Sequence, residues 1–201
     1  MSRFSLVPFR RYPRLVCLLP GVLLLLAGCG QNADVGQAGA QSACKPGHIV
    51  GVAVSWTKGY SSLKGLKQDA DLGVQGHFTA VVGTPTDSSG LVSTDFTFTI
   101  TQVLWDPHHQ IPGSTGSVAI HQTGGCIGDT LYRVDDDPLF QIGEEAILFL
   151  HQFSSGQYYV IGGPSGRFEV HNGLVQPVND EGVKLPSGLS EQQFYALLRR
   201  A

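Results

Sequence analysis

Histidine is the residue of this sequence with the widest chemical use, because a neutral imidazole binds metal ions and exchanges protons near neutral pH. Of seven histidines, six fall in an expected loop or at expected strand ends and turns: His77, His108, His109, His121, His151 and His171. Three of them brought together could hold a metal ion. Their spacing matches no zinc motif such as His-Glu-x-x-His. The pattern therefore favours histidines scattered over the surface, and metal binding stays open as the alternative.

Cys126, in the run Gly124-Gly125-Cys126-Ile127-Gly128, is the one candidate nucleophile. A catalytic cysteine needs a base beside it and a lowered pKa. His121 is close in sequence, but five positions along a strand do not establish a contact. The sequence has no Gly-x-Ser-x-Gly elbow, phosphate-binding loop or dinucleotide fingerprint either. We assign no catalytic residue, no cofactor and no metal ligand.

Acidic and aromatic residues give weaker indications. Clustered carboxylates attract calcium, but Asp135–Asp137 lack the alternating pattern of a calcium loop, and we interpret them as a solvated loop. Glu144-Glu145 is interpreted as a solvated turn before a buried strand. Four aromatic residues belong to the core or line a binding face, and the alternation around them favours the core: Trp56, Trp105, Tyr158 and Tyr159.

The N-terminus has the layout of a secretory signal: four arginines before residue 15, an apolar run over 15–28 and small residues at its end. A membrane span needs about 20 apolar residues, more than this run offers. Leu26-Ala27-Gly28-Cys29 resembles the lipobox of bacterial lipoproteins. The resemblance implies removal of residues 1–28, with a diacylglycerol on the sulfur of Cys29 and a further acyl chain such as palmitate on its amine. A plain secreted protein cut near Ala27 is the alternative.

Export changes the interpretation of the remaining cysteines, since thiols oxidise outside the cytoplasm. Cys44 and Cys126 then form one pair, and a disulfide between them is our prediction. They stand 82 positions apart, so on the chain-entropy model the bond contributes roughly 4 kcal/mol.

Charge excludes one class of partner. Four of the 13 basic residues precede Cys29 and all 16 acidic residues follow it, so residues 29–201 carry nine basic and 16 acidic residues, a formal charge of −7. Such a body is repelled by nucleic acid and by anionic lipid headgroups. We expect no nucleic-acid partner, and membrane attachment through the N-terminal lipid alone.

The chain beyond Cys29 divides into a tether and one domain. Residues 29–43 are polar, small and without an apolar face, as in a flexible linker. Residues 44–201 form a single domain that is long enough for a real core.

Period-two alternation predicts a mainly β domain. We expect strands at residues 48–56, 74–82, 94–105, 117–121, 146–150, 158–161, 167–170 and 174–175. Phe96, Phe98 and Ile100 form the clearest buried face, and residues 146–150 are apolar enough for burial on both faces. In the strand over 74–82, Phe78, Ala80 and Val82 are expected to share one face, opposite His77, Thr79 and Val81. Residues 124–141 are expected to be irregular. A short helix is expected over 61–72, and a capping box at Ser190 predicts a C-terminal helix that ends at Arg200.

This order predicts a small barrel or a curled antiparallel sheet. It resembles the barrels of netrin and tissue-inhibitor-of-metalloproteinase domains, which belong to the oligonucleotide/oligosaccharide-binding type, and also many exported bacterial proteins. The stretches that carry the resemblance are residues 70–72, 98–104, 118–121, 143–150 and 159–168. The inhibitors chelate metal through an N-terminal Cys-x-Cys, which this chain lacks, so that activity is not carried over.

Two hypotheses of function follow. The first is a non-catalytic module, lipid-anchored on the extracytoplasmic side of a bacterial membrane, that binds an envelope protein or glycan. The second is a metal-binding or enzymatic envelope lipoprotein that uses its histidines.

Overall fold

The computed structural model describes residues 46–87 and 89–201, which belong to one unit that spans residues 36–201. The predictions for the signal sequence, Cys29, the tether and Cys44 lie outside the described residues. Within the described part of the chain, no helix combines the length and the apolar character that a membrane crossing requires.

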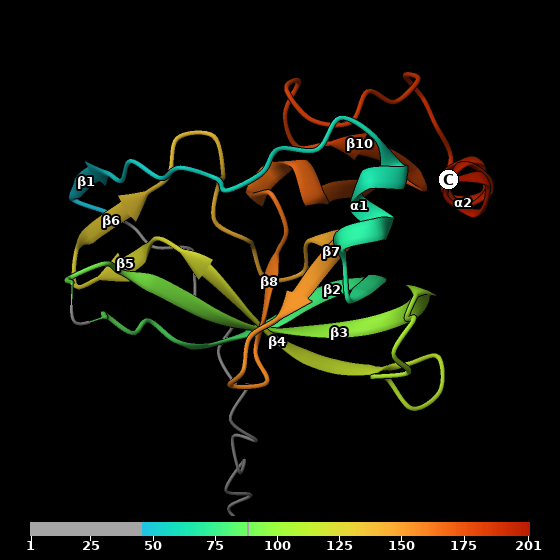
Figure 1. Ribbon diagram of the computed structural model, residues 1–201. Coiled ribbons are helices and arrows are strands. Elements are labelled where there is room, and N and C mark those ends of the chain that lie inside the picture. The colour runs from blue at the N-terminus through green and yellow to red at the C-terminus, as the bar shows by residue number, and fades with distance from the viewer. Residues whose placement is uncertain (1–45, 88) are drawn as a thin grey trace, which may run out of the picture. The chain divides into compact units, whose positions relative to one another are not determined.

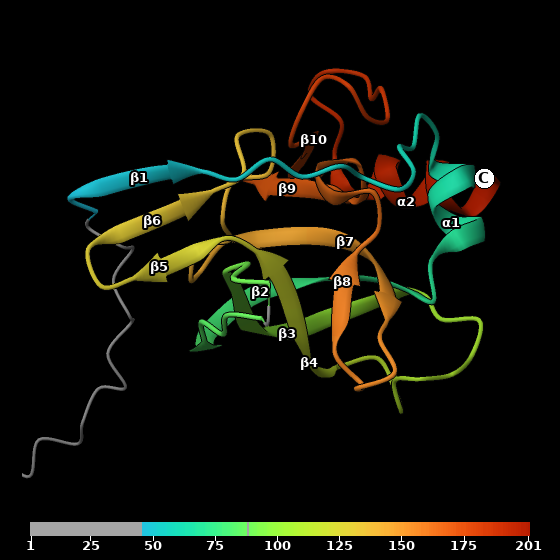
Figure 2. The ribbon, with the colours of Figure 1, turned by 60° about the vertical axis from the view of Figure 1, so that its left-hand side comes forward.

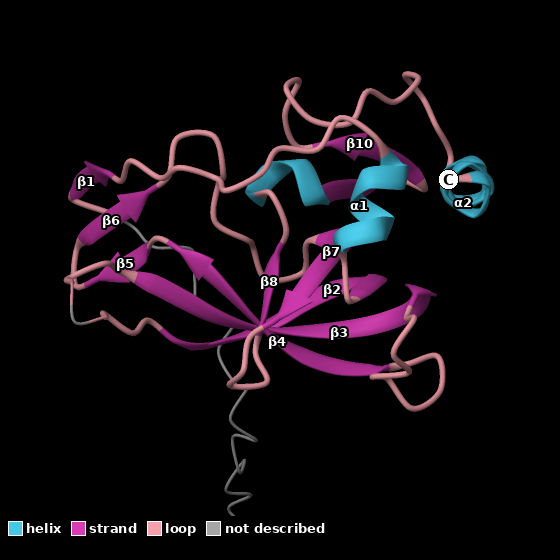
Figure 3. Ribbon diagram, in the orientation of Figure 1, coloured by secondary structure: helices cyan, strands magenta, loops and turns pink. Residues whose placement is uncertain are grey.

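The described chain is mainly β, as predicted (Figure 3). Its strands are β1 (His48–Gly51), β2 (Leu72–Gly83), β3 (Ser93–Trp105), β4 (Gly116–Thr123), β5 (Gly125–Ile127), β6 (Thr130–Arg133), β7 (Glu145–Gln152), β8 (Tyr158–Val160), β9 (Arg167–His171) and β10 (Leu174–Pro177). Its helices are α1 (Leu63–Asp69), the 3₁₀ turn η1 (Gly163–Gly166) and α2 (Glu191–Arg200).

Five strands close into a barrel, in the ring order β2-β3-β4-β8-β7 and back to β2 (Figure 1). All neighbours are antiparallel except β4 and β8, which run parallel. In chain order the ring reads first, second, third, fifth, fourth. Small Greek-key barrels of the oligonucleotide/oligosaccharide-binding type have the same ring order. The predicted small barrel is confirmed.

Strand β7 belongs to two cores at once. Ala146, Leu148 and Leu150 face the barrel interior, where they join Phe78, Phe98 and other apolar side chains. Ile147 and Phe149 face a second core that α1, α2, β9 and β10 cover. These five residues of β7 are all fully buried. The prediction that this strand is covered on both faces is therefore confirmed.

One edge of β7 pairs with β2, and its other edge pairs with two strands in turn. Residues Ala146–Leu148 pair with β9, while Leu150–Gln152 pair with β8. The chain between β8 and β9 makes the tight turn η1. The β7 edge thus connects the barrel to the outer sheet.

The alternation of side chains between the two faces of β2 does not continue regularly beyond Phe78. Phe78 is fully buried, but Ala80 is exposed and Val82 is 67% exposed. The register against β3 shifts between Phe78 and Ala80, and a bulge of this kind reverses the faces of the residues beyond it. By contrast, Phe96, Phe98 and Ile100 of β3 are all buried, as predicted.

Residues 124–141 were expected to be irregular, which is wrong in part. The antiparallel pair β5–β6 occupies residues 125–133, and β1 adds to β6 in parallel (Figure 2). Local sequence gives little sign of this sheet because its strands are short and β1 comes from far along the chain. The same pairing ends β1 at Gly51 rather than Trp56, because β6 ends at Arg133.

Both predicted helices form. Ser62 caps α1 by accepting a hydrogen bond from the Gly65 amide. Ser190 and Gln193 make the predicted capping box of α2, which buries Phe194 and Leu198 against the outer core.

Candidate functional site

A cleft opens where the barrel closes least completely. The parallel strands β4 and β8 are joined by a single bridge, between Ile120 and Tyr158. Beyond that bridge, His121–Thr123 on β4 and Tyr159–Val160 on β8 line a cavity of about 140 Å³. We call this cavity the seam cleft. It exists because the ring closes through one short parallel contact rather than a full ladder.

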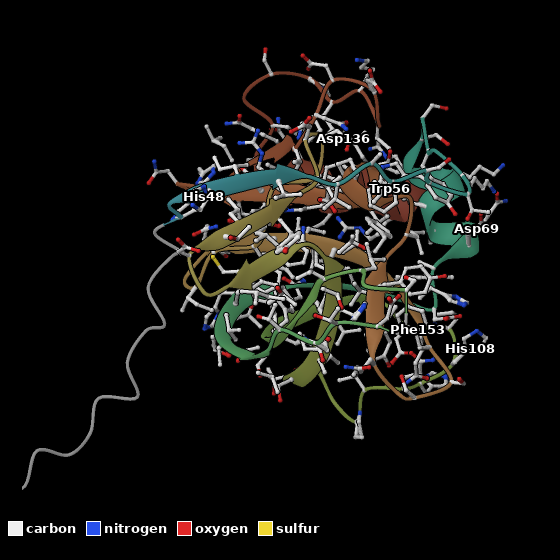
Figure 4. The ribbon with its side chains drawn as sticks, turned by 90° about the vertical axis from the view of Figure 1, so that its left-hand side faces the viewer. His48, Trp56, Asp69, His108, Asp136 and Phe153 are labelled. Carbon is white, nitrogen blue, oxygen red and sulfur yellow. The ribbon has the colours of Figure 1, made fainter. Side chains whose placement is uncertain are left out.

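Trp56 forms one wall of the seam cleft, and a glycine allows it to do so. Gly163 has a left-handed backbone (φ +55°), and a Cβ there would lie 2.4 Å from the indole ring. The ring therefore rests directly on the η1 backbone. The indole Nε1 donates a hydrogen bond to Asp136 Oδ2 at 3.3 Å. Trp56 stands above Phe153 in Figure 4.

The inner part of the cleft is lined by Asp137, which is only 6% exposed. Burial raises the pKa of Asp137 above its ordinary value, while a hydrogen bond with Gln122 and the charge of Arg167 oppose the rise. The solvated loop predicted for Asp135–Asp137 is thus wrong at its last residue. Asp135 and Asp136 are exposed, as predicted.

Arg167 explains why Asp137 is buried. Its guanidinium is 2% exposed and donates to Glu144 Oε1 at 2.7 Å and to the Pro138 carbonyl at 2.6 Å, and it lies 4.4 Å from the Phe140 ring centroid. Asp137 Oδ1 lies 3.7 Å from the Arg167 Nη1 atom. These contacts fix the segment that carries Asp137. Glu144, expected in a solvated turn, instead has a side chain that is 9% exposed.

A row of four rings runs from the cleft over its outer rim. The ring centroids are 6.0 Å apart for His121 and Phe153, 4.5 Å for Phe153 and Tyr159, and 5.3 Å for Tyr159 and His151. We call these four side chains the ring ladder. Phe153, in the β7–β8 turn, is 41% exposed. An exposed aromatic surface beside a cleft is typical of a binding site.

An aspartate holds each imidazole at the ends of the ring ladder. His121 Nδ1 lies 2.6 Å from Asp95 Oδ1, because the two residues face each other in the β3–β4 register. His151 Nδ1 lies 2.7 Å from Asp71 Oδ2. A carboxylate on one ring nitrogen fixes the orientation of an imidazole and leaves the other nitrogen for a ligand.

The histidines predicted as possible metal ligands do not all gather. His108 approaches the other oxygen of Asp71 at 3.9 Å, whereas His171 contacts Glu169 and His121 belongs to the seam cleft. In the part of the chain that the structure describes, no three His, Cys, Asp or Glu side chains form a group that could hold a metal ion.

Cys126 is half-buried in β5 and has an interaction partner. Cys44 lies outside the described residues, so the Cys44–Cys126 disulfide stays a prediction. His121 points its Nδ1 atom at Asp95 Oδ1.

The predictions for the aromatic residues divide. Tyr158 is buried in the barrel core, where core was favoured, and its hydroxyl donates to Gln110. Trp105 and Tyr159 are partly buried against the outer core, and Trp56 and Tyr159 line the seam cleft. Phe153 was not singled out, and Asp137 was considered only as part of the Asp135–Asp137 run. An aromatic residue placed directly before the turn Ser154-Ser155-Gly156 was the available signal for Phe153.

No protein-family model matches the chain, and comparison with curated proteins finds no relative.

Proposed function

We propose that the protein is a bacterial lipoprotein, anchored through Cys29 on the extracytoplasmic side of the membrane, whose barrel is a non-catalytic binding module. The ligand site of this module is the seam cleft with the ring ladder beside it. The observation that carries the proposal is the 41% exposed Phe153 at the mouth of a cleft that Trp56 and Tyr159 also line. Exposed aromatic rings at the edge of a cleft with a few fixed polar groups favour binding of a ligand.

The location supports this proposal. Barrels of this type bind their ligands on the face of the second and third strands and on the loops after the first and fourth strands. Here the second and third strands are β3 and β4, which supply Asp95 and His121. The loop after the fourth strand supplies Phe153. These side chains, rather than the fold, support the proposed site.

The N-terminal part of the proposal follows from Leu26-Ala27-Gly28-Cys29. A lipid on Cys29 holds the module to the membrane, and residues 30–43 act as a tether. We further propose that Cys44 and Cys126 form a disulfide at the start of the domain. An intact mass measured before and after reduction tests both modifications at once.

Site-specific photo-cross-linking in bacterial cells tests the binding site without knowledge of the ligand. A benzophenone side chain replaces Phe153 in one variant and Leu174, which is 38% exposed on β10, in the control. We expect a cross-linked product from position 153 only. Products of equal yield from both positions, or none from position 153, contradict the proposed site. Membrane fractionation of Cys29→Ala tests the anchor separately, and retention of this variant in the membrane would argue against it.

A further inference from the structure

The chemistry of the seam cleft also identifies a class of ligand, and this inference rests on the proposed function. The ring ladder offers flat apolar surface at the cleft mouth, with Phe153 41% exposed and its centroid 4.5 Å from that of Tyr159. The face of an aromatic ring carries partial negative charge and attracts weakly positive C–H groups. One face of a pyranose ring is a flat array of such C–H groups.

The polar groups of the cleft suit hydroxyl ligands. Asp137 brings a buried carboxyl group to the cavity, and Thr123 brings a hydroxyl. His121 brings an imidazole whose Nδ1 atom is held by Asp95, which leaves Nε2 as the ligand-facing nitrogen. A sugar hydroxyl both donates and accepts, so it can bond to a carboxyl group, an imidazole nitrogen and a hydroxyl alike.

The charge around the cleft disfavours an anion. Among the residues that the structure describes, no lysine or arginine lines the cavity. Arg167 is close to Asp137, but its guanidinium is 2% exposed and is bonded to Glu144 and to the Pro138 carbonyl. Residues 29–201 as a whole carry a formal charge of −7. Nucleic acid binding requires cations that contact phosphates, so the oligonucleotide class of ligand does not fit this face.

We infer that the seam cleft binds an uncharged saccharide, with one sugar ring stacked on Phe153 and its hydroxyl groups bonded to Asp137 and His121. A cavity of about 140 Å³ holds a small part of a chain rather than a long polymer. The ligand is then the end or one exposed unit of a glycan, and the rest of that glycan extends over the ring ladder.

Calorimetric titration of the detergent-solubilised full-length protein tests this inference. The probes are neutral oligosaccharides of glucose, mannose, galactose and N-acetylglucosamine, together with a sulfated heparin oligosaccharide, choline and an oligothymidylate. We expect saturable binding of at least one neutral oligosaccharide. Phe153→Ala should weaken it about tenfold, because this variant loses the aromatic face on which the sugar ring stacks. Phe153→Tyr should retain it, and Leu174→Ala should leave it unchanged.

Three results overturn the inference: binding of a charged probe only, neutral binding that is indifferent to Phe153→Ala, and no binding of any neutral oligosaccharide. Circular dichroism of each variant confirms that its fold is intact, and Phe153→Tyr provides the readout if the alanine variant does not fold. The cross-linking experiment separates the two levels of the proposal. A product at position 153 without saccharide binding rejects the saccharide and keeps the site, whereas no product at position 153 rejects the site itself.

Discussion

Replacement of Gly163 by alanine tests how Trp56 is held in the wall of the seam cleft. The new methyl group would lie 2.4 Å from the indole ring, so the ring or the η1 backbone must move. Gly128 provides a matched control. Its φ of +61° is close to the +55° of Gly163, but no atom lies within 4 Å of its added Cβ. The two alanine variants therefore share backbone strain and differ in the steric clash.

The expected magnitudes follow from these two contributions. A left-handed backbone costs an alanine about 1–2 kcal/mol, which applies to both variants. Overpacking against a ring adds about 1–3 kcal/mol, which applies to Gly163→Ala alone. We expect Gly128→Ala to lower the free energy of unfolding by about 1–2 kcal/mol and Gly163→Ala to lower it by about 2–5 kcal/mol.

Urea denaturation followed by far-ultraviolet circular dichroism measures both free energies of unfolding. A shifted midpoint at an unchanged slope reports a change in stability, whereas a changed slope reports a change in the compactness of the unfolded or folded state. Binding at the seam cleft should weaken in Gly163→Ala and stay unchanged in Gly128→Ala. Equal losses of stability in the two variants would show that Trp56 does not rest on Gly163, and the description of this wall would be wrong.

Three further predictions concern the surroundings of the cleft and the outer core. Glu144→Ala leaves the buried Arg167 charge without its main partner and should cost about 3–5 kcal/mol in urea denaturation, whereas the exposed control Glu181→Ala should change stability by less than about 0.5 kcal/mol. Because burial raises the pKa of Asp137, its folded form binds a proton more tightly than its unfolded form, and this contribution to stability is lost as the pH rises from the unfolded value of 3.8 through the folded pKa. Stability measured against pH should therefore fall less over that window in Asp137→Asn than in the unchanged protein, and parallel curves would contradict the burial of this carboxyl group. Ser190→Ala removes the cap of α2 and should lower the free energy of unfolding by about 1 kcal/mol; no loss would show that the capping box does not stabilise the helix.

The parts of the fold that local pattern determines could be predicted. Phe96, Phe98 and Ile100 alternate along one antiparallel strand, and the apolar run over 146–150 needs cover on both faces wherever it lies. Ser190 and Gln193 stand three residues apart, and the side chain of each accepts a hydrogen bond from the backbone amide of the other. Each of these signals lies within one element, so the sequence alone carries it.

The seam cleft could not be predicted in this way, because it arises from contacts between distant parts of the chain. Asp137 is buried by Arg167, and Trp56 is held by Gly163 and Asp136. The cleft itself depends on the parallel β4–β8 contact, which has no local signature. Three successive aspartates are more often solvated than buried, so their composition pointed away from the role of Asp137.

The two tryptophans provide the most direct test of the seam cleft as the ligand site. Both can be replaced biosynthetically by 5-fluorotryptophan, which gives one fluorine resonance for Trp56 in the cleft wall and one for Trp105 at the end of β3, outside the cleft. We would titrate the solubilised full-length protein with the oligosaccharide or envelope component that binds. The account predicts that the Trp56 resonance shifts saturably while the Trp105 resonance stays in place. A ligand that binds and shifts Trp105 alone, or neither resonance, would contradict the assignment of the site.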